Sequence, residues 1–242
     1  MWLGHREKSR LPGLGGPPGW SDRFSFWPEP GKSGLRERIR YVTVGPLRSN
    51  SYLLLDSGSG EAVIIDAGDE PHKILEMISP GVKVRGIIAT HGHFDHVLAV
   101  DDLREALGVE FLIHSEDQAV LDILPESTLR ILGASMKPPK PDGYLDDGDE
   151  IRVGELVLKL IHTPGHTPGS SCLLTGKTLF SGDTLFAGSI GRTDIPLGDS
   201  QRIIESIRKR LYTLPDDVVV YPGHGWQTTI GTEKRSNPFV RG

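Results

Sequence analysis

The stretch THGHFDH, residues 90–96, follows the apolar run VRGIIA and precedes a helix-like pattern of apolar residues. Its three imidazoles and one carboxylate are side chains of the types that bind zinc and other first-row metals. A fully extended chain would point alternate side chains the same way, whereas a turn at Gly92 followed by a helix can split them between two metal ions. Clustered histidines can also cap a helix or lie in solvent, but this density at a strand end favours a metal site. The four candidate ligands are His91, His93, Asp95 and His96.

Three further candidate ligands each lie beside the end of a predicted strand. His166 sits in the loop sequence TPGHTPGS, Asp183 follows the strand-like sequence TLFSG, and His224 lies in YPGHG after the last predicted strand. The full set is then five histidines and two aspartates, which exceeds the four ligands of one tetrahedral ion. A site for two metal ions with one shared carboxylate fits this number better.

Other polar residues near these motifs have simpler interpretations. His114 ends a strand just before the capping-box sequence SEDQ (115–118), and we expect a structural role for it. His162 adjoins the TPGHTPGS loop, and a structural role is again favoured over contact with a ligand. Cys172 lies within a strand and is expected to be a small core residue rather than a nucleophile. Asp66 ends the strand EAVIID, and the sequence leaves open whether it caps a turn or orients a metal-bound imidazole through the second ring nitrogen.

The composition of the whole chain excludes several classes of protein. The 242 residues carry 27 Lys and Arg against 32 Asp and Glu, a net charge of −5 with no footprint for nucleic acid or anionic lipid. No apolar run approaches the ~20 residues of a membrane helix, and the N-terminus has no apolar h-region of a secretory signal. The single cysteine excludes an internal disulfide and a thiolate-rich metal site. We therefore expect a cytoplasmic protein that binds neither nucleic acid nor membranes.

The sequence pattern predicts one folded domain preceded by a different kind of segment. Residues 1–35 contain seven Gly and five Pro and show no helical or strand period, which predicts a disordered tail. In residues 36–242 strands and helices alternate, with an extended loop and a short helix expected within 125–142. Strands are expected at 38–44, 50–56, 61–66, 84–90, 110–113, 150–153, 155–161, 171–174, 178–181 and 217–221, and helices at 70–79, 95–107, 115–124 and 200–211.

The ordered set of these motifs resembles the metallo-β-lactamase superfamily, and within it the glyoxalase II, or hydroxyacylglutathione hydrolase, branch. The resemblance covers about residues 38–240. The stretch FAGSIGRTD (186–194) and the ending NPF (237–239) resemble the short, single-domain glyoxalase II-like proteins of bacteria. The resemblance implies an α/β fold of the αββα type, in which two mixed β-sheets are flanked by helices and the metals lie at one edge.

The resemblance also implies a division of labour among the candidate residues. Asp183 bridges the two metals, and Asp66 matches an early aspartate of the family, which supports the orienting role. Arg192 falls where the family has a glutathione-anchoring Lys, while Asp194 and Trp226 fall where family tyrosines contact glutathione. Arg192 and Trp226 are therefore candidate substrate-binding residues. The first metal would be held by His91, His93 and His166, and the second by Asp95, His96 and His224.

The activity implied is hydrolysis of a thioester by two divalent metal ions, zinc first and iron or manganese as alternatives, because the ligands are all N or O. A water shared by the metals, with its pKa lowered to about 7, would supply the hydroxide that attacks the carbonyl. Asp95 and Asp183 are the candidate catalytic residues, and Asp95 would also hold the proton of the nucleophile. The partner would be a small-molecule thioester, glutathione-derived by resemblance. The chain ends at Gly242 without the C-terminal helical domain of full-length glyoxalase II, which argues for weak binding of glutathione.

Two alternative activities use nearly the same residues. The run GRTD (191–194) is shared with persulfide dioxygenases, which would use one iron held by His91, His166 and Asp183. A lactonase or β-lactamase is the third reading, although the thiolate-using zinc β-lactamases have Cys where this chain has Asp183. A nuclease of the superfamily would need a larger basic surface or an inserted domain, and an intact set of seven ligands argues against a non-catalytic binding module.

Overall fold

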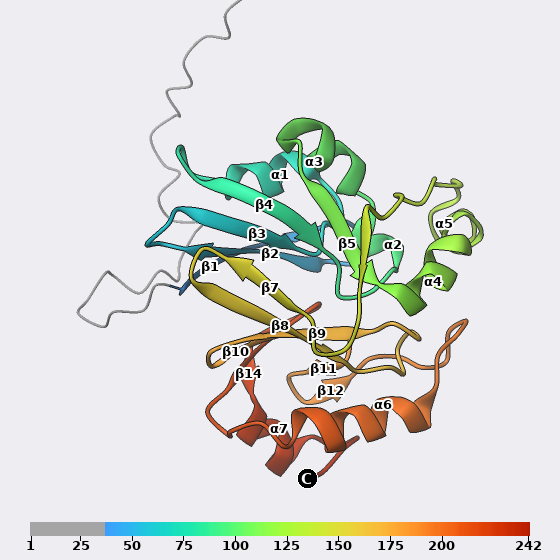
Figure 1. The fold of residues 1–242 in the computed structure, drawn as a ribbon. Helices are drawn as coiled ribbons and strands as arrows, with labels where there is room; N and C mark the ends of the chain where they lie inside the picture. Colours follow the sequence, from blue (N-terminus) through green and yellow to red (C-terminus); the bar gives the residue numbers. More distant parts are fainter. Residues whose placement is uncertain (1–36) are drawn as a thin grey trace, which may run out of the picture. The chain divides into compact units, whose positions relative to one another are not determined.

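The structure, a computed structural model, describes residues 37–242. The chain divides into two units, Met1–Leu35 and Arg36–Gly242, and every helix and strand below belongs to the second. The tail predicted at residues 1–35 lies outside the described residues. Figure 1 shows the second unit as two sheets, one from each half of the sequence, with helices on their outer faces.

The first sheet contains six strands in sequence order from β1 to β6. The β1/β2 and β2/β3 pairs are antiparallel, and the remaining three pairs are parallel, so the sheet is mixed. Helices provide the crossovers that parallel neighbours require. The strands are β1 (Glu37–Val44), β2 (Ser49–Asp56), β3 (Glu61–Ile65), β4 (Lys83–Ile88), β5 (Glu110–His114) and β6 (Gly143–Leu145).

The second sheet also contains six strands, in the order β14-β13-β10-β9-β8-β7. Only the β10/β13 pair within it is parallel among the described residues. A separate two-stranded ribbon follows β10. The strands are β7 (Glu150–Val153), β8 (Leu156–His162), β9 (Ser171–Thr175), β10 (Thr178–Gly182), β11 (Leu185–Phe186), β12 (Ser189–Ile190), β13 (Val219–Pro222) and β14 (Thr228–Thr229).

Short helices connect the strands and cover the sheets. In Figure 1, α1 and α3 cover the outer face of the first sheet, and α6 and α7 cover the second. Within residues 37–242 no helix is long and apolar enough to cross a membrane. The helices are α1 (Pro71–Glu76), α2 (Phe94–Val97), α3 (Val100–Leu107), the 3₁₀ turn η2 (Ser115–Asp117), α4 (Gln118–Asp122), α5 (Leu124–Leu132), α6 (Ser200–Ser206), the π-helical turn η3 (Ile207–Leu211) and α7 (Ile230–Ser236).

The apolar residues of β2 explain why the two sheets are layered. Successive side chains of a strand point to opposite faces. Leu53 and Leu55 accordingly pack in the cluster beneath the helices of the first half, whereas Tyr52 and Leu54 pack in the cluster between the two sheets. A strand buried on both faces needs cover on both. The predicted αββα architecture is therefore confirmed.

The expected single helix at 95–107 is wrong, because the structure has two helices there, α2 and α3. At the break the Ala99 amide donates to the Ala67 carbonyl (2.9 Å), and the Ala67 amide donates to the His96 carbonyl (2.8 Å). The loop after β3 therefore replaces the bonds of a continuous helix. Gly68 permits this approach, since a Cβ there would lie 2.1 Å from the Asp95 carbonyl oxygen.

Other boundaries moved for similar tertiary reasons. The helix expected at 200–211 is α-helical only to Ser206 and then widens into the π-helical turn. The strand expected at 217–221 is not the last, because β14 and α7 follow it. Neither element had a clear period in the sequence: β14 is two threonines paired with β13, and α7 packs Ile230 in the cluster beneath the second sheet.

The ends of four strands converge at one edge of this unit. β3 and β4 are parallel neighbours, as are β10 and β13, so their carboxyl ends lie together within each sheet. Backbone bonds then join the two halves, from the Asn50 amide to the Gly223 carbonyl (2.7 Å) and from the Ser171 amide to the Thr90 carbonyl (2.9 Å). Segments more than 80 residues apart in sequence therefore meet where the candidate ligands lie.

Candidate metal centre

The structure brings all seven candidate ligands to this edge. His91 and His93 lie in the loop after β4, and α2 begins at the next residue, so Asp95 and His96 belong to its first turn. The helix therefore splits the four residues of THGHFDH, which is the turn alternative and not the extended one. Three more strand-end loops complete the set: the β8–β9 loop with His166, the residue after β10, Asp183, and the loop after β13 with His224.

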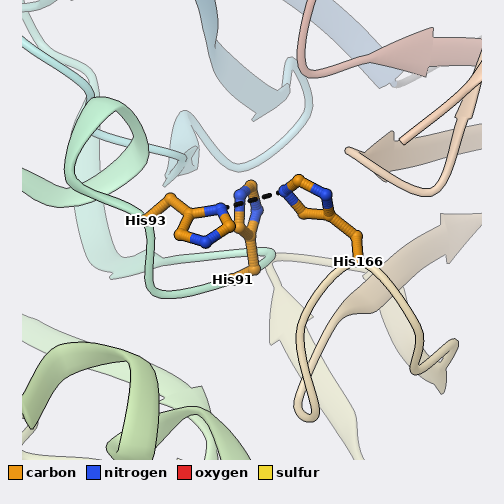
Figure 2. Close-up of side chains that lie close together, drawn as sticks. All are labelled: His91, His93 and His166. Carbon is orange, nitrogen blue, oxygen red and sulfur yellow. Dashed lines mark hydrogen bonds between the residues drawn. The ribbon is translucent and has the colours of Figure 1, made fainter. Parts of the chain in front are cut away.

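The first ligand group consists of His91, His93 and His166, whose nearest ring nitrogens all lie within 4.8 Å of one another. His93 Nδ1 and His166 Nε2 are 2.9 Å apart. Figure 2 shows the three rings pointing toward a common centre from two different loops. Three imidazoles that converge in this way could supply three nitrogen ligands to one metal ion.

The second ligand group consists of Asp95, His96 and His224, and it is richer in charge. His224 Nε2 lies 3.3 Å from Asp95 Oδ2, and His96 Nε2 lies 3.6 Å from the same oxygen. The side chain of His96 is fully buried, while that of His224 is partly exposed. This group therefore has a solvent-facing side at His224.

Asp183 lies between the two groups. Its Oδ2 is 3.5 Å from His166 Nε2 of the first group and 3.5 Å from His224 Nε2 of the second. Its Oδ1 is 3.5 Å from His96 Nε2. Gly223 makes room for this carboxylate, since a Cβ there would lie 2.2 Å from Asp183 Oδ1. Asp183 is thus placed to serve both groups.

The buried polar atoms of these side chains indicate whether the site suits a metal. Within residues 37–242, three buried side-chain atoms have no hydrogen-bond partner: His91 Nε2, His96 Nε2 and Asp183 Oδ1. Buried polar atoms are normally paired, because leaving one unpaired costs about 1–3 kcal/mol. All three belong to the ligand groups. The His and Asp clusters are consistent with a binuclear metal site.

A single buried carboxylate orients one imidazole of each group. Asp66 Oδ2 lies 2.9 Å from His96 Nδ1 and accepts the Thr90 hydroxyl (2.9 Å). Thr90 Oγ1 in turn lies 3.1 Å from His91 Nδ1. Since these acceptors favour protons on both Nδ1 atoms, the Nε2 atoms of His91 and His96 face the centre and are the nitrogens that a metal would bind. The orienting alternative for Asp66 therefore fits the geometry better than a turn cap.

Asp66 holds an unusual backbone conformation to reach this position. Its φ is 58°, in the left-handed region that non-glycine residues seldom adopt. The Asp66 amide donates to the Ile88 carbonyl (2.9 Å), and its Oδ1 accepts the Thr90 amide (2.7 Å). Strained residues that are fixed from several sides concentrate at functional sites.

Backbone carbonyls orient two of the remaining histidines. His166 Nδ1 lies 2.7 Å from the Arg192 carbonyl, and His224 Nδ1 lies 3.1 Å from the Leu47 carbonyl. A carbonyl only accepts, so each Nδ1 donates its proton and each Nε2 is the nitrogen that a metal would bind. Sequence could not reveal these contacts, because any residue at either position offers the same carbonyl.

The charges of the two groups shift their pKa values in opposite directions. Burial and neighbouring imidazoles lower the pKa of His91 well below its usual value and that of His93 to about 3. Burial also acts on His96, but the surrounding carboxylates outweigh it and raise the pKa to about 9. Hydrogen bonds that the His224 imidazole donates to the carboxylates of Asp183 and Asp95 outweigh burial and raise its pKa to about 11.

The two carboxylates respond to the same field. Burial by itself would raise the pKa of Asp183, but the nearby imidazoles hold it well below its ordinary value. The pKa of Asp95 is likewise lowered, chiefly by His96 and His224 against the effect of burial. Both carboxylates are therefore ionised at neutral pH and ready to bind cations.

Ser49 is a site residue that the sequence reasoning missed. It begins β2, is buried, and donates its hydroxyl to Asp95 Oδ2 (3.0 Å). It also forms an isolated bridge to His224. A small polar residue 46 positions away from Asp95 gives no local signal of this contact.

The candidate substrate residues lie at the surface. The side chains of Arg192 and Asp194 are 71% and 76% exposed, and two nitrogens of Arg192 donate to the two carboxylate oxygens of Asp194 at 3.0 and 3.2 Å. Trp226 is 81% exposed, two residues after His224. The Arg192 carbonyl, as noted, touches His166, so this loop borders the metal centre.

The residues for which we expected structural roles lie outside the two ligand groups. The rings of His114 and His162 stack on each other with centroids 4.0 Å apart. His162 Nε2 lies 2.8 Å from the Pro168 carbonyl. Cys172 is fully buried, and burial raises the pKa of its thiol to about 11, which is the environment of a core residue.

The chain is similar in sequence and structure to proteins of one family. Residues 44–224, which contain all seven candidate ligands, match the Metallo-beta-lactamase superfamily. Hydroxyacylglutathione hydrolase GloC of Haemophilus influenzae is 37% identical over 207 residues, which cover 84% of this chain and 97% of that protein. The crystal structure of BLEG-1 B3 metallo-beta-lactamase has a TM-score of 0.79 at 35% identity, and covers 85% of this chain and 100% of that one. The crystal structure of TTHA1623 in a di-iron-bound form has a TM-score of 0.74 at 40% identity, and covers 83% of this chain and 100% of that one.

Proposed function

The chain belongs to the metallo-β-lactamase superfamily as a metal-dependent hydrolase, and we propose that it hydrolyses thioesters with two divalent metal ions. The observation that carries this proposal is the pair of ligand groups that meet at Asp183, with three buried ligand atoms left unpaired. His91, His93 and His166 would hold one ion, and Asp95, His96 and His224 the other. Zinc is our first choice, with iron or manganese as alternatives.

The protein residues around the centre have separate tasks in this reaction. Two bound metals supply Lewis acidity at the substrate carbonyl and a water with its pKa lowered to about 7. Asp183 and Asp95 are the catalytic carboxylates, and the Asp95 Oδ2, which accepts from Ser49, is placed to hold the proton of the attacking water. The thiolate leaving group, with a pKa of about 8.5, departs without a general acid.

Arg192 and Trp226 are the proposed substrate contacts. The exposed Arg192 already binds one carboxylate, that of Asp194, through two hydrogen bonds. The same fork geometry suits the carboxylate of a substrate such as a glutathione thioester. The relative named hydroxyacylglutathione hydrolase supports this class of substrate. A single cysteine fits a reducing, cytoplasmic setting for the reaction.

The test of the function combines metal content with two assays. We expect elemental analysis of the purified protein to find two metal ions per chain, and S-D-lactoylglutathione to be hydrolysed with release of the free thiol. Oxygen uptake on glutathione persulfide should stay at background. Two metals without thioester hydrolysis would contradict the substrate, and a chain without bound metal would contradict the proposal as a whole.

A second candidate is an iron-dependent persulfide dioxygenase. The observation in its favour is a relative of 40% identity whose crystal structure is described as di-iron-bound, because it shows that a fold of this kind accepts iron. The facial triad would be His91, His166 and Asp183, of which His166 and Asp183 lie 3.5 Å apart. Persulfide-dependent oxygen uptake in the assay above would select this activity over hydrolysis.

A third candidate is hydrolysis of a β-lactam or lactone. It rests on the similarity to a structure described as a B3 metallo-beta-lactamase, at 35% identity. An amine leaving group needs a proton that a thiolate does not need, so this reaction asks more of the site. We expect turnover of a β-lactam to be slower than turnover of a thioester.

The role of Arg192 is tested by a pair of variants. Arg192→Ala should raise KM for S-D-lactoylglutathione with a smaller change in kcat, because the lost contact lies away from the reacting carbonyl. Asp194→Asn should lower KM, since it releases the guanidinium. A neutral thioester without a carboxylate should respond to neither change. A fall in kcat for both substrates would show that Arg192 acts on the loop that supports His166 instead.

A further inference from the structure

A buried carboxylate outside the two ligand groups has no role in the proposed reaction. Asp117 is fully buried at the end of η2, the turn after β5. The capping box predicted at SEDQ is wrong, because His114 caps the turn by accepting from the Glu116 amide (3.2 Å) and Ser115 donates its hydroxyl to Asp146 instead (3.0 Å). Asp117 occupies the position before α4. It makes no side-chain capping bond to that helix. Its carboxylate is turned away from the helix that it precedes.

The Asp117 carboxylate instead accepts three hydrogen bonds from two distant loops. Oδ2 accepts from the Gly92 amide (2.6 Å) and from the Thr167 hydroxyl (2.9 Å), which lie 25 and 50 residues away. Oδ1 accepts from the Gly169 amide (2.6 Å), 52 residues away. A buried carboxylate paired with amide and hydroxyl donors forms short, strong hydrogen bonds in a medium of low dielectric.

The three donors lie next to the first ligand group. Gly92 stands between His91 and His93, and Thr167 directly follows His166. The carboxylate therefore ties the loop after β4 to the β8–β9 loop at the point where each presents its imidazoles. The ligands of the second group have other partners: Asp66 lies against His96, and Ser49 donates to Asp95.

The close approach of Asp117 leaves no room for a Cβ at Gly169 and little room for one at Gly92. A Cβ on Gly169 would lie 2.6 Å from the Asp117 amide nitrogen and 2.8 Å from Oδ1. A Cβ on Gly92 would lie 3.2 Å from the Asp117 carbonyl oxygen. Both loops thus pack their backbones directly on this residue.

We propose that Asp117 is a positioning residue that holds His91, His93 and His166 in register for one metal ion and has no comparable effect on the other. The inference rests on the proposed two-metal function. It predicts a selective effect, because each amide that loses its acceptor belongs to a loop of the first group. A merely structural carboxylate would weaken both ions together or neither.

The test is the variant Asp117→Asn. The amide keeps the shape of the side chain, but its NH₂ group must face at least one backbone N–H, whichever way it turns. We expect one of the two ions to bind tenfold or more weakly in a chelator competition, which is the scale of support lost from behind a ligand. The affinity for the other ion should change much less.

Asp56→Asn is a matched control. Asp56 is also fully buried, and it accepts from the Gly58 amide (3.0 Å), the Ser59 hydroxyl (2.9 Å) and the Glu155 amide (3.0 Å). It lies at the far end of β2, about 23 Å along the strand from Ser49. This variant should lower the melting temperature of the metal-free protein as Asp117→Asn does, yet bind both ions with wild-type affinity.

A second variant covers failure of Asp117→Asn to fold, and a second measurement shows where its effect lies. If Asp117→Asn does not fold, Thr167→Val removes one of the three donors, and should weaken the same single ion by a few-fold. If Asp117→Asn folds, its metal-free form should show faster amide hydrogen exchange at Gly92 and Gly169 than the wild type, with exchange in the His224 loop unchanged.

The outcomes separate this inference from the proposed function. A wild-type chain that binds no metal would overturn the function itself. A wild-type chain with two ions, together with an Asp117→Asn variant that keeps both at unchanged affinity, would overturn only the role of Asp117. Equal weakening of both ions, in step with the loss of melting temperature and matched by Asp56→Asn, would also overturn it.

Discussion

The two ligand groups are built from similar side chains but differ in charge. In the first group, burial and neighbouring imidazoles keep the pKa values of His91 and His93 low, so both present neutral nitrogens. In the second, carboxylates raise the pKa values of His96 and His224 to about 9 and 11, so both carry protons when no metal is bound. The first group is thus preformed for a cation, whereas the second is already neutralised by its own protons.

The two groups are also supported differently. The loops of the first group are tied by Asp117 and by the Arg192 carbonyl. The second group is anchored by Asp66, by Ser49 and by the Leu47 carbonyl. We therefore expect the order of binding and the pH dependence of each ion to depend on these surroundings as well as on the ligand types.

Asp183→Ala should affect both ligand groups most strongly, because it removes the one carboxylate among residues 37–242 for which distances of 3.5 Å to histidines of both groups are seen. We expect hydrolysis to be nearly abolished and metal content to fall to one ion per chain or fewer. Elemental analysis and the thioester assay measure both effects. Two retained ions with near-normal turnover would end the bridging assignment.

His114→Ala and Cys172→Ser are the controls for that variant. Both residues are buried and have partners outside the ligand groups: His114 stacks on His162, and Cys172 contacts the Thr163 hydroxyl. Each should leave the metal content unchanged. A loss of metal in either would mean that the site had been misplaced.

Asp66→Asn should weaken both ions and so reduce the contrast between the groups. Asp66 orients His96 directly and His91 through Thr90, and loss of such support typically costs 10–100-fold in metal affinity. Chelator competition measures the two affinities. Thr90→Val interrupts only the relay and should weaken the first ion alone. If Asp66→Asn leaves the first ion at wild-type affinity, the Thr90 relay has no energetic role.

The smallest expected effect is a pH dependence in the folding stability of the metal-free protein, which tests the difference in charge between the two groups. His96 and His224 have folded pKa values of about 9 and 11, above the unfolded value of about 6.5. The stability that they contribute is therefore fully present below pH 6.5 and is lost as the pH rises through 9 and beyond. Burial raises the pKa of Asp117 only to about 6, so its titration lies below this window.

The measurement is the melting temperature in the presence of a chelator. It should be lower at pH 9.5 than at pH 6.5. Protein loaded with metal has already released these protons and should lack the decline. A metal-free melting temperature that is flat over this range would show that the second group holds no such protons.

The chemistry of the site could be predicted from the sequence to a large extent. The residue types and strand-end positions of the histidines and aspartates indicate a metal centre, and all seven candidates lie together in the structure. Most strands were also predictable, since β2 and β3 contain the short apolar runs YLLL and AVII bounded by turn residues. Local composition is enough for such elements because a short apolar run between turn signals is typical of a buried strand.

The failures have a common cause. The helix expected at 95–107 breaks because the Ala67 carbonyl, from a loop 32 residues before Ala99, takes the Ala99 amide. Ser49 and Asp117 were missed as site residues because their partners at the site are distant in sequence. Those of Ser49 lie 46 or more residues away, and those of Asp117 lie 25 or more residues away. Their short side chains are common in caps and turns, which is how SEDQ was interpreted.

The sequence by itself determined which atoms could bind a metal, where they lie on strands and loops, and the family that the chain resembles. Only the tertiary structure decided the geometry of the two groups that the resemblance implied, which nitrogen of four of the five histidines faces the centre, and which group carries protons. The physical reason is that ligand identity is a property of a side chain. Orientation and pKa depend on carbonyls, carboxylates and burial that distant segments supply.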